Sequence, residues 1–215
     1  MSLANSLAAC VAASICAFAR ILTGVQARWL GSQPESRQRI YFANHSSHAD
    51  FVLIWASLPE FVRRRTRPVA GADYWDKPGI RRYLMNHVFR AVLVDRTRGA
   101  GGADPLATMR TALDAGDSLI IFPEGTRNTS DELLPFKAGL YYLAESHPDV
   151  ELVPVWLANL NRVLPKGQVL PVPLICSVSF GEPMGLSQNE ERDEFLQRAR
   201  AVLQSWAPRG EEPAE

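Results

Sequence analysis

Residues 39–58 read Arg39-Ile40-Tyr41-Phe42-Ala43-Asn44-His45-Ser46-Ser47-His48-Ala49-Asp50-Phe51-Val52-Leu53-Ile54-Trp55-Ala56-Ser57-Leu58. The first five residues favour an extended backbone, and the apolar run from residue 50 to residue 58 is typical of a helix. The polar residues between them form a loop. We therefore predict a strand, a loop that carries His45, and a helix that begins at Asp50.

This spacing suits general-base chemistry. If the loop folds back, Asp50 can accept a hydrogen bond from one imidazole nitrogen of His45 and leave the other nitrogen as a base for a substrate hydroxyl. An imidazole with an unperturbed pKa of about 6.5 is largely neutral at cytosolic pH, as a base must be. The alternative is that Asp50 caps its helix and His45 fills a turn.

A second segment has the composition of a phosphate site. Residues 118–122 are an apolar strand-like run, which Pro123 ends, and the loop that follows carries a carboxylate, a glycine, a hydroxyl and a guanidinium: Glu124, Gly125, Thr126 and Arg127. Arg127 can bind two phosphate oxygens, Thr126 can donate to a third, and Gly125 allows backbone amides to approach. The alternative is a surface loop closed by an ion pair between Glu124 and Arg127.

Two further strand-like runs complete the pattern. Residues 91–94 are apolar and precede the charged pair Asp95-Arg96, and a Val-Pro-Val run begins at Val153. Charged residues at strand ends are candidates for ligand contacts in open α/β sheets. A plain surface ion pair is equally compatible with Asp95-Arg96.

The order of these segments resembles the lysophospholipid acyltransferase family. That family carries an Asn-His-x-Ser-x-x-Asp block, a strand ending in Asp-Arg, a Phe-Pro-Glu-Gly-Thr-Arg block and a Val-Pro-Val block, which correspond here to residues 44–50, 92–96, 122–127 and 153–155. The run from Pro135 to Gly139 resembles the segment that follows the third block. The resemblance covers roughly residues 38–160.

The resemblance implies an enzyme that moves a fatty acyl group from acyl-CoA or acyl-ACP to the free hydroxyl of a lysophospholipid, with 1-acylglycerol-3-phosphate as the expected acceptor and phosphatidic acid as the product. It implies no other cofactor and no metal. The alternatives are acylation of another lyso-lipid, with a larger head group or an amino-lipid head, and hydrolysis of the thioester or lipid. By resemblance, the dyad is His45 and Asp50, and the substrate-binding residues are Arg96, Glu124, Gly125, Thr126, Arg127, Lys137 and Pro154.

The sequence departs from the family pattern at three places. His48 stands where an aromatic residue is common, Arg90-Ala91 where a glycine commonly opens the second block, and Asn128 where serine is usual. The first departure places a second imidazole close to the expected base. The other two bear on the head group of the acceptor.

The N-terminal segment carries no charged side chain from Ser2 to Ala19, and its large apolar residues recur every three or four positions: Leu3, Leu7, Val11, Ile15, Phe18 and Leu22. This periodicity predicts an amphipathic helix that lies in or on a membrane. A spanning helix, a signal peptide and a helix packed on the domain are the alternatives. We expect the enzyme on the cytoplasmic face of the membrane, bound peripherally or by shallow insertion.

The composition is that of one globular catalytic domain, since 47% of the residues are hydrophobic and 21% are charged. The zero net charge makes nucleic acid an unexpected partner, and Cys10, Cys16 and Cys176 have no metal-ligand or redox spacing. We expect them to be small buried residues. No Gly-rich nucleotide-binding motif is present. The expected partners are therefore the lipid acceptor, the acyl carrier and the membrane surface.

The remaining pattern alternates strands and helices. We predict further strands at residues 67–70, 91–94, 118–122, 151–156 and 174–180, and helices at residues 77–88, 104–115, 138–146 and 190–206. Such alternation predicts an α/β fold with a mixed, largely parallel sheet covered by helices. The expected domains are an N-terminal membrane-associating helix at 1–30, the acyltransferase domain at 31–207 and a flexible tail at 208–215.

Overall fold

The structure is a computed structural model, and it describes residues 3–95, 104–128, 130, 132–158 and 176–207. In chain order the elements are α1 (Leu3–Thr23), β1 (Gln26–Trp29), β2 (Arg39–Ala43), α2 (Asp50–Ser57), α3 (Glu60–Arg63), β3 (Thr66–Gly71), α4 (Ala72–Trp75), α5 (Ile80–Tyr83), the π-helical η1 (Leu84–Val88), β4 (Val92–Val94), α6 (Pro105–Asp114), β5 (Ser118–Ile121), α7 (Gly139–Ser146), β6 (Glu151–Ala158), β7 (Ser177–Phe180) and α9 (Arg192–Gln204).

The strands of the described residues form one seven-stranded sheet in the order β1-β7-β6-β2-β5-β3-β4. Five consecutive strands of the sheet run parallel to one another: β6, β2, β5, β3 and β4. The other two run the opposite way, since β7 is antiparallel to β6 and β1 is parallel to β7. The predicted α/β fold with a mixed, largely parallel sheet is therefore confirmed. The carboxyl ends of β2 and β5, which are adjacent, bring the loops that follow these strands to one edge.

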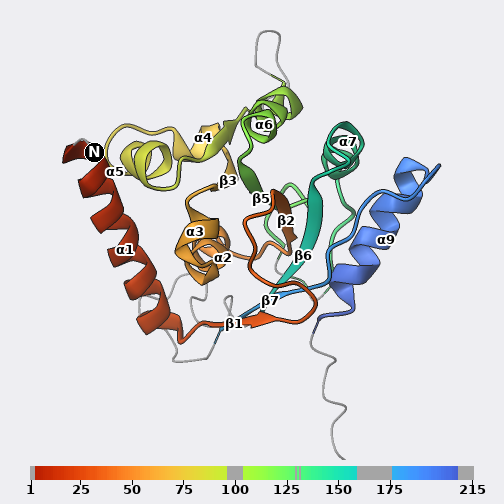
Figure 1. Cartoon of the computed structure of the whole chain (residues 1–215), viewed down its shortest axis with the longest axis horizontal. Helices are drawn as coiled ribbons and strands as arrows, with labels where there is room; N and C mark the ends of the chain where they lie inside the picture. Colours follow the sequence, from red (N-terminus) through yellow and green to blue (C-terminus); the bar gives the residue numbers. More distant parts are fainter. Residues whose placement is uncertain (1–2, 96–103, 129, 131, 159–175, 208–215) are drawn as a thin grey trace, which may run out of the picture.

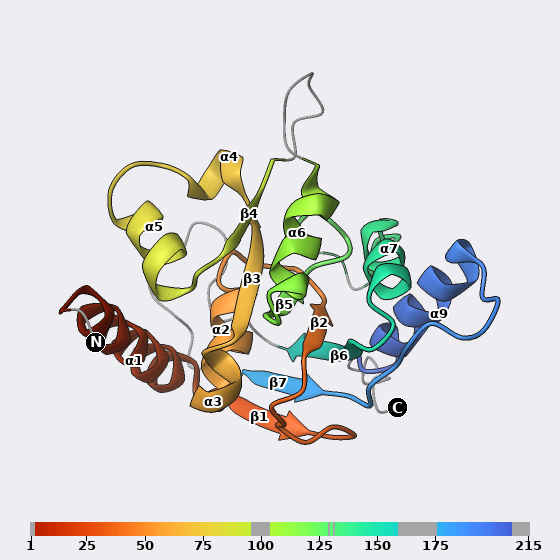
Figure 2. The same cartoon turned by 45° about the horizontal axis from the view of Figure 1, so that its top comes forward.

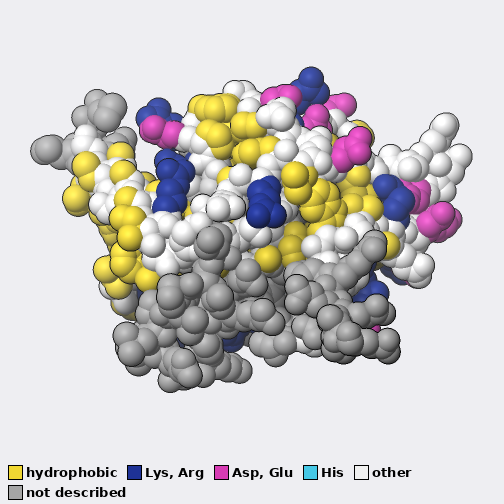
Figure 3. Space-filling view, turned by 90° about the horizontal axis from the view of Figure 1, so that it is seen from below, with side chains coloured by type: hydrophobic (Ala, Val, Ile, Leu, Met, Phe, Trp, Pro, Cys, Tyr) yellow, Lys and Arg dark blue, Asp and Glu magenta, His cyan; other side chains and the backbone are white. Residues whose placement is uncertain are grey.

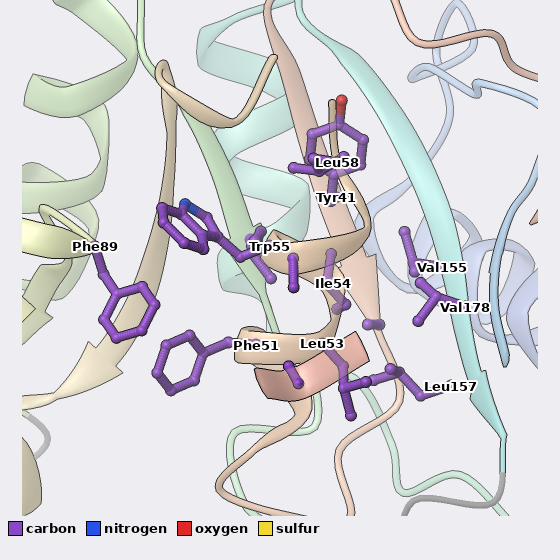
Figure 4. Packing of buried hydrophobic residues seen from close by; sticks show 14 of the residues in the cluster. Tyr41, Phe51, Leu53, Ile54, Trp55, Leu58, Phe89, Val155, Leu157 and Val178 are labelled. Atoms are coloured by element: carbon purple, nitrogen blue, oxygen red, sulfur yellow. The ribbon is translucent and has the colours of Figure 1, made fainter. Parts of the chain in front are cut away.

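Helices cover both faces of the sheet (Figures 1 and 2), so β2 is buried throughout. Its alternate residues enter separate cores. Tyr41 and Ala43 lie in the core that includes α2, and Ile40 and Phe42 lie in the core that includes α7 and α9. Figure 4 shows the first core, in which Phe51 and Trp55 of α2 pack with Phe89 beside the sheet.

Helix α1 packs against α2 and η1 at one end of the molecule (Figure 1). Cys16, Ala19 and Thr23 are buried in this contact, and the Arg20 guanidinium donates to the Ala56 carbonyl over 2.8 Å. The predicted apolar stripe is divided: Val11 and Ile15 pack toward the core, whereas Leu7 and Phe18 are exposed. The stripe therefore does not form one outward face.

Three expectations need correction. The helix predicted at residues 77–88 begins only at Ile80, because Pro78 precedes Gly79, whose φ of +97° is outside the helical region. The N-terminal segment predicted for residues 1–30 also contains β1, which pairs with β7. Cys10 is exposed, and only Cys16 and Cys176 are buried as expected. The predicted tail at 208–215 lies outside the described residues, as do residues 174 and 175 of the last predicted strand.

Candidate active site

The loop between β2 and α2 folds back so that the side chains of His45 and Asp50 meet. His45 Nδ1 lies 2.8 Å from Asp50 Oδ2, the contact that the sequence predicted. An ionised carboxylate only accepts hydrogen bonds, so Nδ1 carries the proton and Nε2 holds the lone pair in the neutral ring. His45 Nε2 has no hydrogen-bond partner among the described residues. The arrangement leaves Nε2 able to take a proton from a bound hydroxyl.

Asp50 is fully buried and is held by the loop that it organises. Besides His45, its Oδ2 accepts the backbone N–H groups of Ser46 over 2.6 Å and Ser47 over 2.8 Å. The carboxylate also belongs to the first residue of α2, where the helix dipole favours negative charge. Asp50 thus fixes the loop and the ring together, rather than capping its own helix through its side chain.

The orientation of the His45 ring is fixed from a second direction. Phe122, the residue after β5, stacks on the imidazole with the ring centroids 4.1 Å apart and the planes 19° apart. The side chain of His45 remains 19% exposed. The ring is therefore held on one face and at one nitrogen while substrate can still reach it.

The carboxylate of Glu124, which was expected to bind substrate, is bound by groups of the protein itself. It is 1% exposed. Its Oε1 accepts the backbone N–H of His45 over 3.1 Å, and its Oε2 accepts the backbone N–H of Leu134 and the side-chain Nδ2 of Asn128, both over 2.9 Å. The ion pair considered between Glu124 and Arg127 is not formed. Glu124 is placed to position the backbone of His45.

Two asparagines that the sequence did not single out as positioning residues, Asn44 and Asn128, also hold this loop. The backbone N–H of Asn128 donates to the His45 carbonyl over 2.6 Å, so both backbone polar groups of His45 are bound by the segment 124–128. Asn44 exchanges two hydrogen bonds with the backbone of Leu157, of 3.0 and 2.8 Å, and so ties the loop to β6. The position of Asn44 directly after β2 was the signal available in the sequence.

The loop after β5 presents Thr126 and Arg127 to solvent. The backbone N–H of Gly125 donates to the Phe122 carbonyl over 3.0 Å, which closes a turn, so that amide is not available to a phosphate as the sequence had suggested. Lys137 lies over the turn, since a Cβ added to Gly125 would meet its side chain at 3.3 Å. No carboxylate among the described residues pairs with Arg127. A cationic loop therefore lies beside the His45–Asp50 pair.

His48 lies in the loop between β2 and α2, three residues after His45. Its ring stacks on Tyr74 with the centroids 4.2 Å apart and the planes 7° apart. Burial lowers the pKa of His48 below its usual value, and the positive charges of Arg127, of protonated His45 and of Arg81 lower it further against the opposing effect of Asp50. The ring of His48 is therefore neutral near pH 7.

One predicted site residue, Pro154, is not brought to this cluster. Pro154 is buried within β6, and its ring lies near Gly181 and Trp206, on the face of the sheet opposite α2. Side chains of a strand alternate between faces, so Pro154 points away from the core that includes α2, and the acyl-donor role that the resemblance implied for it stays a prediction. Arg96 lies outside the described residues. Within the described part of the chain, no group of three or more His, Cys, Asp or Glu side chains could hold a metal ion.

Comparison with known proteins gives a consistent result. The family model described as Acyltransferase matches residues 26–158. A 1-acyl-sn-glycerol-3-phosphate acyltransferase of Limnanthes alba is 32% identical over 89% of this chain, and a lyso-ornithine lipid O-acyltransferase of Brucella abortus is 24% identical over 86% of it. The alignments cover 67% and 78% of these two relatives, and the chain spans 66% of the corresponding enzyme of Limnanthes douglasii.

A solved structure has the same fold. The 1-acyl-sn-glycerophosphate acyltransferase of Thermotoga maritima superimposes with a TM-score of 0.69, covering 97% of this chain and 85% of that one at 22% identity.

Proposed function

The chain belongs to the acyltransferase family, and we propose that it transfers a fatty acyl group from an acyl thioester to the free hydroxyl of 1-acylglycerol-3-phosphate, which gives phosphatidic acid. The observation that carries this proposal is the 2.8 Å contact between His45 Nδ1 and Asp50 Oδ2 beside the loop of Arg127. It combines a base for a hydroxyl with a cation for a phosphate.

In the proposed reaction, His45 Nε2 takes the proton of the acceptor hydroxyl while the oxygen attacks the thioester carbonyl. The tetrahedral intermediate then collapses, the C–S bond breaks, and the imidazolium returns the proton to the leaving thiolate. Asp50 stabilises the imidazolium between these steps and keeps the proton on Nδ1. The acyl group passes directly to the acceptor, so no acyl-enzyme forms.

The acceptor phosphate would be bound by Arg127 and Thr126, with Lys137 close by. A guanidinium can bind two phosphate oxygens at once, which orients as well as attracts the ligand. Fixing the phosphate places the free hydroxyl at a defined distance from His45, and such positioning supplies a large part of the rate in a two-substrate reaction. Arg96 and a CoA or acyl carrier protein donor stay proposals that rest on the family resemblance.

We also propose that α1 holds the protein on the cytoplasmic face of the membrane, where the acyl carriers and the lipid acceptor meet. Residues Ser6–Thr23 are long and apolar enough to cross a membrane. However, the contacts of Cys16, Ala19 and Arg20 with the domain favour a helix that lies in the interface. Figure 3 shows apolar side chains along the edge of the molecule that α1 forms, with cationic side chains nearby.

Acylation of a lyso-ornithine lipid is the second candidate, because one relative carries that name. The dyad would act in the same way on its hydroxyl. The two acceptors differ at the head group, since an ornithine lipid has no phosphate for Arg127 to bind.

One assay separates these functions. Purified protein is incubated with a labelled long-chain acyl-CoA or acyl-ACP and with 1-acylglycerol-3-phosphate, lyso-ornithine lipid or no acceptor, and the labelled products are resolved. We expect labelled phosphatidic acid only with the first acceptor, and none from folded His45→Ala. Labelled ornithine lipid would support the second candidate, and labelled free fatty acid without an acceptor would indicate a hydrolase.

A further inference from the structure

The ring of His48 is held rigidly although it is not part of the dyad. Tyr74 of α4 covers one face of the ring, and Trp75 meets it edge-on with the centroids 6.1 Å apart. The Arg81 guanidinium lies 4.9 Å from the centroid of Tyr74 and extends this stack. Stacking fixes the plane of the imidazole and therefore confines its two nitrogens to the edge of that plane.

Both ring nitrogens of His48 lack a hydrogen-bond partner among the described residues. The surrounding charge is nevertheless well defined. The hydrogen bond from the Asn128 backbone to the His45 carbonyl joins the loop of His48 to the loop of Arg127, and the cations Arg127 and Arg81 both act on His48. A half-buried N–H donor with no protein partner, placed between cations, suits an anionic ligand.

We propose that His48 donates a hydrogen bond to the phosphate of the acceptor and forms, with Arg127, the subsite that selects a phosphomonoester head group. This inference rests on the proposed function and assigns a specificity-determining residue to it. A phosphomonoester carries close to two negative charges at pH 7 and offers several acceptor oxygens. A phenylalanine at this position could stack in the same way but could not donate.

The second imidazole is not an alternative base. Asp50 Oδ2 is already occupied by His45 and by the backbone N–H groups of Ser46 and Ser47. The His48 ring has no hydrogen bond to a carboxylate among the described residues, so no directly bound negative charge stabilises its protonated form during proton transfer. A bound phosphate would instead supply that negative charge, and it would raise the pKa of His48 from its lowered value.

His48→Phe is the informative variant, because a phenyl ring keeps the stack on Tyr74 and removes only the nitrogens. His87→Phe is the matched control. His87 is exposed on η1, which precedes the amino end of β4, whereas the dyad follows the carboxyl end of β2. The kcat and the KM values for 1-acylglycerol-3-phosphate and for acyl-CoA are measured for both variants. A hydrogen bond to a charged group typically contributes about 1.5–3 kcal/mol, which is about a 10- to 100-fold change in affinity.

We expect His48→Phe to raise the KM for the acceptor about tenfold or more, with kcat and the KM for acyl-CoA unchanged, and His87→Phe to change nothing. An unchanged acceptor KM, or a loss confined to kcat, overturns the assignment of His48 while leaving the acyltransferase function intact. Absence of transfer to 1-acylglycerol-3-phosphate by the unmodified protein would instead refute the function itself.

A second pair of variants keeps the test valid if His48→Phe does not fold. His48→Gln retains an N–H donor without the ring, and His48→Leu fills a similar volume without a donor. We expect the acceptor KM of His48→Gln to lie well below that of His48→Leu. Equal values for the two variants would contradict the proposal.

Discussion

At His45, two carboxylates act on different parts of one residue. Asp50 binds the ring through Nδ1 and thereby determines which nitrogen is the base. Glu124 binds the backbone N–H of the same residue and thereby fixes the backbone position from which the ring projects. Because Asp50 is fully buried and Glu124 is 1% exposed, we expect neither carboxylate to contact the acceptor's phosphate. Replacing either one should therefore alter the chemical step more than the binding of the acceptor.

The dyad predicts a specific order of losses in kcat. His45→Ala removes the base and should lower kcat by about 10²–10⁴-fold or more. Asp50→Asn keeps an oxygen that can accept the N–H groups of Ser46 and Ser47, but it removes the charge that stabilises the imidazolium, so its loss should lie between wild type and His45→Ala or approach the latter. Turnover is measured at saturating acceptor after circular dichroism has shown each variant to be folded. Near-normal turnover by folded His45→Ala would reject the dyad.

Glu124→Gln tests the positioning of the backbone. A glutamine has the same shape but only one acceptor oxygen. Its NH₂ group would therefore face either the N–H of His45 or the N–H of Leu134, which places two hydrogen-bond donors against each other. We expect kcat to fall about 10- to 100-fold, with the acceptor KM little changed, since an unsatisfied buried group costs about 1–3 kcal/mol. Steady-state kinetics provide the measurement, and Glu194→Gln on the exposed surface of α9 is the control. A rise in acceptor KM at constant kcat would return Glu124 to the role of a phosphate-site residue.

The contact between His45 and Asp50 could be predicted from the sequence because the two residues are only five positions apart, at the two ends of a short polar stretch. The position of Glu124 could not, since it binds a residue 79 positions away and depends on β2 and β5 being neighbours in the sheet. Pro154 shows a second limit of the sequence pattern. Its block marks a buried strand, but the alternation of side chains along β6 points the proline away from α2.

At the scale of elements, the central strands could be predicted from their apolar runs, whereas an exposed, polar strand could not. The sequence predicted β2 to the residue, because its side chains are buried on both faces of the sheet. The edge strand β1, Gln26–Trp29, is mostly exposed and has no apolar pattern to reveal it. Its existence follows from pairing with β7, which is a long-range contact that no local periodicity can indicate.

Helix α1 combines two roles that its sequence did not separate. Deleting residues 1–20 would remove the buried Cys16 and Ala19 together with the exposed side chains, so point variants give a clearer test. The double variant Phe18→Ser with Ile21→Ser changes only side chains that are 66% and 84% exposed. Each large apolar side chain buried in an interface contributes about 1.5–3 kcal/mol, so we expect vesicle binding to weaken by at least tenfold, and activity on vesicles to fall more than activity on short-chain monomeric substrates.

The measurement for α1 is flotation with lipid vesicles, with Leu30→Ser as the control, because Leu30 is 56% exposed outside this helix. Unchanged vesicle binding by the double variant would refute the membrane role of α1. An equal loss in Leu30→Ser would show that the effect is not specific to the helix.

In the molecule as a whole, a stabilising ion pair and the reactive groups lie at opposite ends of the parallel strands. The His45–Asp50 pair and the Arg127 loop lie at the carboxyl ends of β2 and β5, whereas Arg39 and Glu151 pair at the amino ends of β2 and β6. Ligand sites of open parallel sheets gather at the carboxyl edge. Substitutions at the two edges should therefore have different consequences.

Glu151→Gln tests that separation. Arg39 is 2% exposed, and its Nε donates to Glu151 Oε2 over 2.8 Å while Nη1 donates to the Gln33 carbonyl over 2.6 Å. Removing one partner of a fully buried ion pair costs about 3–5 kcal/mol. Glu151 is partly exposed, and Glu35 lies 3.9 Å from Arg39 as a substitute partner. We therefore expect the free energy of unfolding to fall by only about 1–3 kcal/mol.

Denaturant unfolding gives this value, and kcat and both KM values should stay at wild-type levels below the unfolding transition. A loss of activity in the folded variant would show that the amino edge is coupled to the dyad, and the division of the sheet into a stabilising and a reactive edge would then be wrong.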